Sequence, residues 1–380
     1  MAVQRVPESV YRLFFVAGEA SGDTHGANLI TALKAMLPGV ECTGLGGQQM
    51  AAAGMALRHD LAGEAIMGFA EVVRKIRPIR RLFMETLSWL EANRPDCVVL
   101  IDYPGFNIRL AKELKARGIP VIFYISPQIW AWKKKRIHTI AACGEKMLVI
   151  FPFEEALYRA IGMDCRYVGH PLLDHIGRFT HPARKPDRMT IGLLPGSRTQ
   201  EIRRILPAMM DTARGIRKAF PEARFCIPCV DAGRAAQIEK MAGDFPLEIQ
   251  VGGMYDILAQ ARFCMVTSGT ATLETALFGV PMAIAYRTSL ATYLLARTLV
   301  KLQHIGIVNI LAERSIVPEF IQQDLRAERM LPTALELIRD TPARAAMIAA
   351  LGEVREKLGS GGASRAAAEE IRTFLEGRCD

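Results

Sequence analysis

The sequence of 380 residues lacks any long uninterrupted apolar run. No segment approaches the roughly 18 to 20 apolar residues that a membrane-spanning helix requires. The apolar run Leu13–Ala17 near the amino terminus is also too short for the hydrophobic region of a signal peptide and is typical of a first strand. We therefore expect a cytoplasmic protein.

Metal-ligand spacing is also missing. The eight cysteines occur singly, apart from Cys226-Ile-Pro-Cys229, and no second pair offers zinc its remaining ligands. That pair falls inside an apparent strand, Arg224–Val230, whereas a redox Cys-x-x-Cys opens a helix. None of the seven histidines forms H-E-x-x-H. We expect buried, reduced thiols, no bound metal and no cofactor.

Three common glycine motifs are absent as well. The turn after the first strand contains neither G-x-G-x-x-G nor G-x-x-x-x-G-K-[ST], which disfavours a dinucleotide enzyme and a P-loop ATPase. The turns at Ser21 and Ser197 do not match G-x-S-x-G, which disfavours a serine hydrolase.

The composition that is present is that of a folded, basic protein. Half of the residues are hydrophobic, and the chain is longer than the about 250 to 300 residues that one core supports, so we expect two domains. The formal charge of +9 indicates an anionic partner: nucleic acid, a membrane surface or a phosphorylated metabolite. No nucleic-acid fold motif is present, so we expect no nucleic-acid partner.

Short apolar runs alternate with helix-length segments along the chain, which predicts parallel sheets covered on both faces. The predicted strands are Leu13–Ala17, Cys97–Ile101, Val121–Ile125, Met147–Ile150, Thr190–Leu194, Ala223–Pro228, Phe263–Val266 and Met282–Ala285. The polar stretch 178–188 between the two halves is the predicted linker. We expect two doubly wound Rossmann-like domains, 1–180 and 188–380, facing a central cleft, with terminal helices that can pack back on the first domain.

Two turns of the first half follow predicted strands. Gly18-Glu-Ala-Ser-Gly-Asp23 places small residues and carboxylates where a strand meets a helix, although Ser21 or Asp23 could simply cap that helix. Asp102 ends the strand Cys97–Ile101, which is where a general base would face the cleft. A turn residue that binds nearby backbone amides explains Asp102 equally well at this stage.

Two turns of the second half suit an anionic ligand. In Leu193-Leu-Pro-Gly-Ser-Arg-Thr-Gln-Glu-Ile202, Gly196 and Ser197 offer backbone amides and Arg198 adds a positive fork. A plain capping turn would not require the arginine, so we favour diphosphate binding.

The second of these turns is Ser268-Gly-Thr-Ala-Thr-Leu-Glu274, in which Ser268, Gly269 and Thr270 open a helix whose first amides can hold phosphate. Glu274 could accept hydrogen bonds from ribose hydroxyls. The alternative is a helix cap with a buried glutamate, which is costly when unpaired.

A basic and apolar segment, 66–83, includes Met67, Phe69, Arg74, Arg77 and Arg81. This pattern is typical of an element that lies on anionic lipid. It is also typical of an ordinary amphipathic helix with a solvated charged face.

Taken together and in order, the turns resemble those of bacterial lipid-A-disaccharide synthases, inverting glycosyltransferases of the GT-B type. The resemblance covers nearly the whole chain. The motifs that carry it are Gly18–Asp23, Ile101–Asn107, Ser126-Pro-Gln-Ile-Trp-Ala-Trp132, Leu194–Arg198 and Ser268–Glu274.

The resemblance implies transfer of 2,3-diacylglucosamine from its UDP derivative to the 6-hydroxyl of 2,3-diacylglucosamine 1-phosphate. It implies Asp102 as the base with Glu19 in the same site. It also implies Arg198 and the Ser268 turn at the diphosphate, Glu274 at the ribose, and Asn309 in the nucleotide pocket. Because the substrates are diacylated, it further favours contact of segment 66–83 with the anionic inner face of the inner membrane. A homodimer is possible on the sequence evidence.

The chain departs from the family pattern at two positions. Gly105 stands where the family often has a second acidic residue, and Glu313 stands where glycine is typical. Two other functions remain to be tested: another GT-B enzyme that uses UDP-N-acetylglucosamine, such as a 2-epimerase or transferase, and a non-catalytic basic module that binds membrane or RNA.

Overall fold

The computed structural model describes residues 11–63, 69–127, 136–177, 189–289, 293 and 303–378, without the side chains of residues 69–76. The chain divides into two compact units. Unit 1 contains Met1–Asp174 and Ser360–Asp380, and unit 2 contains His175–Gly359. The chain therefore enters unit 2 a few residues before the predicted boundary, and its last segment belongs to unit 1. The predicted linker 178–188 lies outside the described residues.

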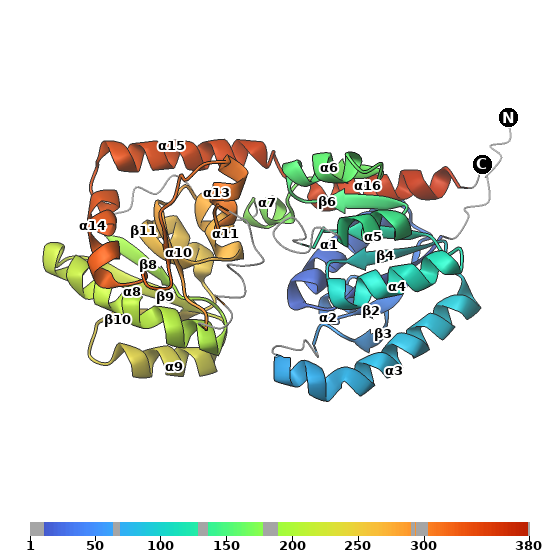
Figure 1. Cartoon of the computed structure of the whole chain (residues 1–380), viewed down its shortest axis with the longest axis horizontal. Coiled ribbons are helices and arrows are strands. Elements are labelled where there is room, and N and C mark those ends of the chain that lie inside the picture. The colour runs from blue at the N-terminus through green and yellow to red at the C-terminus, as the bar shows by residue number, and fades with distance from the viewer. Residues whose placement is uncertain are drawn as a thin grey trace. The chain divides into compact units, whose positions relative to one another are not determined.

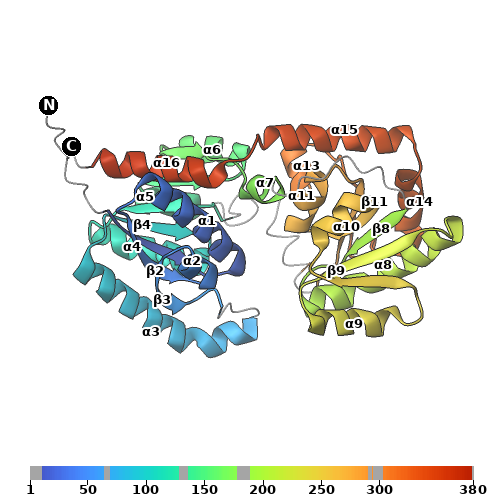
Figure 2. The same ribbon diagram turned by 180° about the vertical axis from the view of Figure 1, so that it is seen from behind.

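Unit 1 is a parallel α/β layer structure (Figure 1). Its described strands are β1 Arg12–Ala17, β2 Glu41–Gly46, β3 Ala56–Asp60, β4 Cys97–Ile101, β5 Val121–Tyr124, β6 Lys146–Val149 and β7 Cys165–Tyr167. Its described helices are α1 Ala20–Met36, α2 Gln48–Ala52, α3 Phe69–Asn93, α4 Pro104–Ala116, α5 Arg136–Cys143, α6 Pro152–Arg159, α7 Pro171–Ile176, which crosses the unit boundary, and α16 Ala363–Glu376. The strands form one sheet in the order β3-β2-β1-β4-β5-β6-β7. Helices α4 and α5 lie in front of this sheet in Figure 1, and α1 and α16 lie in front of it in Figure 2.

Unit 2 repeats this architecture. Its described strands are β8 Thr190–Leu194, β9 Arg224–Cys229, β10 Leu247–Val251, β11 Ala261–Thr267, β12 Met282–Tyr286 and β13 Glu319–Ile321, in the sheet order β10-β9-β8-β11-β12-β13. Its described helices are α8 Thr199–Ala219, α9 Ala232–Ala242, α10 Met254–Gln260, α11 Thr270–Leu277, α13 Ile307–Ala312, α14 Ala327–Ile338 and α15 Pro342–Lys357. The predicted fold class, two doubly wound α/β domains, is confirmed.

Central and edge strands differ in how well their sequences reveal them. Cys97–Ile101 and Thr190–Leu194 form β4 and β8 with the predicted bounds, because both are fully buried and read as continuous apolar runs. Edge strands β3 and β10 are partly exposed along their length and contain charged residues. They were not predicted, because a half-exposed strand of five residues produces no apolar run.

The strand order reverses at one point in each sheet. In unit 1, β1 pairs with both β2 and β4, and Ala17 lies opposite Ile101 at the carboxyl ends of β1 and β4. In unit 2, Leu194 of β8 lies opposite Val266 of β11. In open α/β sheets the loops that follow two such neighbouring strands diverge to opposite faces, and ligands bind in the crevice between them.

The carboxyl-terminal segment completes unit 1. Helix α16 packs on α1, and Lys146 Nζ of β6 lies 2.5 Å from Glu370 Oε2 of α16. The carboxylate of Asp174 accepts hydrogen bonds from the backbone amides of Gly362 and Ser364 at the start of α16. These contacts hold the start of α16 next to Asp174, the residue at which the chain leaves unit 1. None of the described helices combines the length and apolar character needed to cross a bilayer.

Candidate active site

The turn between β1 and α1 is shaped by close packing. A Cβ added to Gly18 would lie 2.3 Å from Cδ1 of Tyr103, so only glycine lets the Tyr103 ring lie against this backbone. Glu19, the next residue, is exposed at the amino end of α1. Asp23 is buried and accepts hydrogen bonds from the backbone amides of Gly47, Gln49 and Met50 at 2.9 to 3.1 Å. Asp23 therefore anchors the start of α2.

The turn after β4 is strained. Asp102 and Tyr103 have φ angles of 43° and 47°, a left-handed conformation that is unusual outside glycine. The fully buried Asn107 holds this turn, because its Nδ2 donates to the carbonyl oxygens of Ile101 at 3.2 Å and Asp102 at 2.7 Å. Strained backbone of this kind clusters at active sites.

Electrostatics make Asp102 a credible base. Burial and the negative charge of Glu19 raise the pKa of Asp102 to about 6, against the lowering effect of a hydrogen bond from the Tyr103 backbone. Burial and Glu19 also raise the pKa of the Tyr103 phenol. The charge of Glu19 thus acts on Asp102, in line with the shared site that the resemblance implied. At neutral pH a carboxyl with this pKa is ionised and can accept a proton.

Position 105 follows this turn in the first turn of α4. Gly105 is exposed, and a Cβ added there would meet nothing within 4 Å. An acidic side chain would therefore fit, so sterics do not explain why this chain has glycine at that position.

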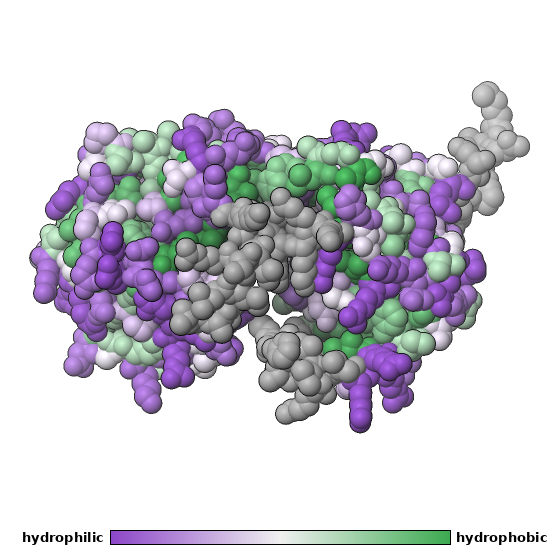
Figure 3. All heavy atoms as spheres, viewed as in Figure 1, coloured by the Kyte–Doolittle hydropathy of each residue, from purple (hydrophilic) through white to green (hydrophobic). Residues whose placement is uncertain are grey.

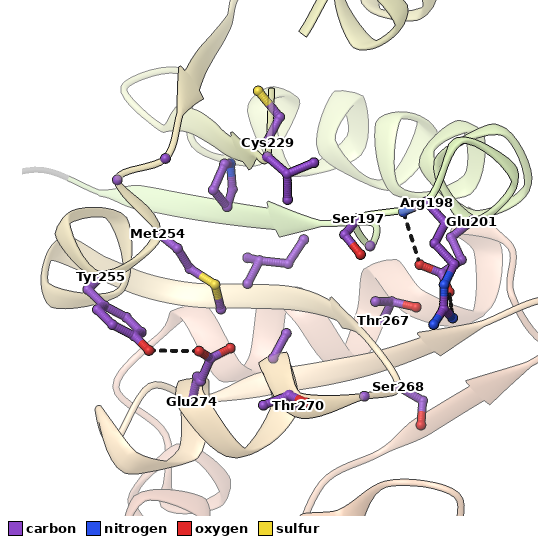
Figure 4. Close-up of a pocket in the computed structure, with 18 of the residues that line it drawn as sticks. Ser197, Arg198, Glu201, Cys229, Met254, Tyr255, Thr267, Ser268, Thr270 and Glu274 are labelled. Atoms are coloured by element: carbon purple, nitrogen blue, oxygen red, sulfur yellow. Dashed lines mark hydrogen bonds and ion pairs between the residues drawn. The ribbon is translucent and has the colours of Figure 1, made fainter. Parts of the chain in front are cut away.

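Unit 2 contains a pocket of about 690 Å³ at the carboxyl end of its sheet (Figure 4). The loops after β8, β9, β10 and β11 line it. The pocket brings together all but one of the residues predicted to bind UDP: Gly196, Ser197, Arg198, Ser268, Gly269, Thr270 and Glu274. Its volume is in the range of small-molecule sites.

One end of the pocket suits an anion. Helices α8 and α11 begin here, so their first backbone amides and the positive ends of their dipoles meet at this end. Arg198 is 65% exposed, and its Nη1 lies 2.8 Å from Glu201 Oε1. Gly196 has φ of 109°, and a Cβ there would lie 2.4 Å from Glu201 Oε2. Gly196 therefore lets the Glu201 carboxylate approach the backbone and orient the arginine.

The opposite end in Figure 4 carries a carboxylate and a phenol. Tyr255 Oη of α10 donates a 2.8 Å hydrogen bond to Glu274 Oε1 of α11. Burial raises the pKa of Glu274, while the hydrogen bond from Tyr255 lowers it. Glu274 therefore has a hydrogen-bond partner for its carboxylate and also lines the pocket, so it is not an unpaired charge.

Asn309 lies elsewhere. It is fully buried in α13, where Nδ2 donates to the Val317 carbonyl and to Glu319 Oε1, both at 2.8 Å. Its Oδ1 accepts from the backbone amides of Ile316 and Val317 at 2.9 Å. The structure thus places Asn309 in the core between α13 and β13 and does not place it in the pocket wall, in contrast to the contact that the resemblance implied.

Several pocket residues were not predicted from the sequence. Glu201, Met254, Tyr255 and His175 line the pocket with the predicted residues. For Met254 and Tyr255, the sequence signal was the pair Gly252-Gly253 in the loop after β10. Both glycines have positive φ and directly follow the alternating strand Leu247–Val251. Once β10 is recognised as a strand, its carboxyl end belongs to the site by topology.

The predicted membrane segment is described only in part. Met67 and the side chains of Phe69 and Arg74 lie outside the described residues. Arg77 is exposed on α3, and Arg81 is exposed with its Nε 2.7 Å from Glu85 Oε1. Hydrophilic side chains project along the described part of α3 in Figure 3.

The cysteine pair behaves as predicted. Cys226 and Cys229 lie in β9, and both are buried free thiols. Burial raises the pKa of the Cys226 thiol to about 11, so it is protonated and unreactive at neutral pH. Within the described ranges, no group of three or more His, Cys, Asp or Glu residues could hold a metal ion.

Comparisons with known proteins agree with this arrangement. The sequence model of the lipid-A-disaccharide synthetase family matches residues 13–369. A lipid-A-disaccharide synthase of Syntrophus aciditrophicus is 39% identical over 374 residues, which cover 96% of this chain and 98% of that protein.

Two solved structures show the same fold at low identity. A UDP-GlcNAc 2-epimerase of Neisseria meningitidis bound to UDP-GlcNAc has a TM-score of 0.63 at 12% identity, covering 96% of this chain and 99% of that chain. The calicheamicin glycosyltransferase CalG4 has a TM-score of 0.64 at 14% identity, covering 98% and 99%. The epimerase likeness concerns the fold alone, whereas the sequence match spans nearly the whole chain. This chain belongs to the lipid-A-disaccharide synthase family of hexosyltransferases.

Proposed function

We propose that this chain transfers 2,3-diacylglucosamine from UDP-2,3-diacylglucosamine to the 6-hydroxyl of 2,3-diacylglucosamine 1-phosphate. The products are the β-1,6-linked disaccharide 1-phosphate and UDP. The observation that carries the proposal is the unit 2 pocket, in which two helix amino ends and Arg198 converge at one end and a partly buried carboxylate lies at the other. This arrangement complements a nucleoside diphosphate, because its anionic diphosphate would meet the positive end and its ribose hydroxyls would meet the carboxylate.

On the donor side, unit 2 stabilises the leaving group. The amides of Ser197 and of the turn Ser268–Thr270, with the guanidinium of Arg198, bind the diphosphate and stabilise the charge that develops on UDP as the glycosidic bond breaks. Glu274 accepts hydrogen bonds from the ribose hydroxyls. The positive charge that the leaving group needs thus comes from the chain's own residues.

On the acceptor side, Asp102 acts as the general base. It removes the proton from the acceptor 6-hydroxyl as that oxygen attacks the anomeric carbon from the face opposite UDP, which inverts the configuration. Glu19 acts on this step through its charge, because it helps to raise the pKa of Asp102 to about 6. A base with that pKa remains ionised at neutral pH and is stronger than an ordinary aspartate.

Asn309 supports the pocket without touching the nucleotide. Its amide holds Glu319, whose carboxylate accepts from the backbone amides of Ile305 and Gly306 at 2.9 Å. Ser268 Oγ in turn donates to the Ile305 carbonyl at 3.0 Å. Asn309 therefore helps to hold the loop on which the Ser268 turn rests.

An activity assay tests the proposal directly. Pure, folded protein incubated with UDP-2,3-diacylglucosamine and 2,3-diacylglucosamine 1-phosphate should release UDP and form the disaccharide. UDP-N-acetylglucosamine, which has no long acyl chains, is the control and should give no turnover. Turnover of the unacylated sugar alone would favour a 2-epimerase or another transferase.

We further propose that the protein works as a peripheral protein on the cytoplasmic face of the inner membrane, through segment 66–83. The exposed Arg77 and Arg81 would meet anionic headgroups, because such residues are each attracted to a negative membrane surface. Arg77→Glu with Arg81→Glu should reduce sedimentation with phosphatidylglycerol vesicles. Arg326→Glu with Arg329→Glu, the same charge change at exposed positions of unit 2, is the matched control. Equal loss in both variants would contradict a localised surface, and sedimentation velocity would test for a homodimer.

A further inference from the structure

The side chain of Tyr255 lies beside Glu274 at the same end of the pocket and is held in place by aromatic contacts. The ring of Tyr255 stacks on Phe278, with centroids 5.5 Å apart and an interplanar angle of 24°, and packs at 5.4 Å against His175. These contacts fix the ring, so its hydroxyl is held toward Glu274 (Figure 4). The phenol and the carboxylate come from different helices, α10 and α11.

The hydrogen bond leaves the carboxylate able to bind a ligand. An ionised carboxylate offers about four acceptor positions, and Tyr255 uses one of them on Oε1. Two vicinal hydroxyls, such as those of a ribose, need two more acceptor positions in a fixed direction. A glutamate side chain has three rotatable bonds, so a second contact is required to hold it in one orientation.

We propose that Tyr255 is a positioning residue that orients Glu274 toward the ribose and thereby makes the pocket select ribonucleotides. The inference rests on the proposed function, because it takes the ligand of the pocket to be a uridine diphosphate sugar. Tyr255 acts through Glu274 and does not take part in the transfer itself.

The charge state of the pair supports this role. Burial raises the pKa of Glu274, which favours the protonated acid and would remove an acceptor that the ribose needs. The Tyr255 hydroxyl works against this effect, because it stabilises the carboxylate. Burial and the Glu274 charge raise the pKa of the Tyr255 phenol, so it keeps its proton and remains a donor throughout the neutral range.

The test compares two nucleotides on three proteins. Tyr255→Phe removes the hydroxyl and keeps the ring packing. Tyr158→Phe is the matched control, since it also removes a hydrogen-bonded tyrosine hydroxyl, here one that contacts Ser126 in unit 1 at 2.9 Å. Calorimetry measures the binding of UDP and of 2′,3′-dideoxy-UDP to the unsubstituted protein and to both variants.

We expect Tyr255→Phe to weaken UDP binding about ten-fold, the scale of one hydrogen bond to a charged group, and to leave dideoxy-UDP binding unchanged. Tyr158→Phe should change neither. Tyr255→Phe also removes the hydrogen bond that lowers the pKa of Glu274. As the solution is acidified, the variant should therefore begin to lose UDP affinity at a higher pH than the unsubstituted protein does.

The outcomes separate the inference from the proposed function. Suppose that the unsubstituted protein prefers UDP over dideoxy-UDP. If Tyr255→Phe then leaves both affinities unchanged, or lowers both by the same factor, the positioning role is wrong, while the nucleotide site itself is supported. If the unsubstituted protein binds neither nucleotide, the proposed function itself fails. In a Glu274→Gln background the effect of Tyr255→Phe should disappear, and persistence of the full effect would overturn the inference.

Discussion

The carboxyl ends of the two sheets have the same topology and opposite chemistry. In unit 1 the loops after β1 and β4 bring two carboxylates, Glu19 and Asp102, into one place and raise the pKa of Asp102. In unit 2 the corresponding loops after β8 and β11 contribute two helix amino ends and Arg198. The comparison separates an acidic side, which we propose accepts the proton, from a positive side, which we propose binds the diphosphate.

The difference teaches that a doubly wound sheet determines where a site lies and leaves its charge to a few loop residues. Backbone conformation differs in the same way. The unit 1 turn holds two non-glycine residues, Asp102 and Tyr103, in a left-handed conformation, whereas the unit 2 turn uses Gly196 for its positive φ. In unit 1 one of the strained residues is the proposed base, whereas in unit 2 a side chain at the strained position would collide with Glu201.

The largest expected effect comes from removing the base. Asp102→Asn should lower kcat/KM about 10³-fold, within the range for loss of a general base, because the amide cannot accept the proton. UDP affinity should not change, since Asp102 belongs to unit 1 and the pocket to unit 2. Steady-state kinetics and calorimetry measure the two. Activity within a few-fold of the unsubstituted protein would remove Asp102 from its proposed role.

A somewhat smaller loss should follow from removing the cation of the pocket. Arg198→Ala should lower kcat about 10²-fold, the lower end for loss of one donor to developing charge, and should also weaken UDP binding. Arg214→Ala is a matched control, because Arg214 forms an (i, i+3) pair with Asp211 on the same helix as the Arg198–Glu201 pair. A similar loss in both variants would indicate damage to α8 and would not support a role at the diphosphate.

The acidic limb of the pH profile should respond to the two carboxylates of unit 1. Because the pKa of Asp102 is raised to about 6 and the base must be ionised, kcat/KM should fall as pH decreases through about 6. Glu19→Gln removes the charge that raises this pKa, so the acidic limb should move to lower pH. An unmoved limb, measured with kcat/KM between pH 4.5 and 8, would mean that another group controls it.

The smallest effect concerns a strained residue outside both sites. Glu313 has φ of 57° at the carboxyl end of α13, a left-handed cap position that favours glycine. This conformation accounts for the glycine that the resemblance leads us to expect at this position. Glu313→Gly should raise the free energy of unfolding by about 1 kcal/mol in urea denaturation and leave kcat unchanged. A loss of activity would give this residue a functional role that its position does not suggest.

The sequence predicted those parts of the fold and site that local patterns determine. Buried strands such as β4 and β8 appear as apolar runs, and the turns that follow them carry Asp102 and Arg198. The hydrogen bond between Tyr255 and Glu274 could not be predicted, because it joins two helices through the strand order of the sheet. The burial of Asn309 depends on β13, a three-residue edge strand without a pattern of its own.

The return of α16 to unit 1 also has a consequence for how the chain folds. Unit 2 is continuous in sequence, so it can complete its sheet during synthesis, with every contact made among residues already present. Unit 1 must wait for the last helix, because Glu370 and the amides of Gly362 and Ser364 reach Lys146 and Asp174 only after the whole of unit 2 has been made. Closing so long a loop slows folding, and the apolar face of α1 that α16 covers stays open to chaperones, or to aggregation, until the end of translation.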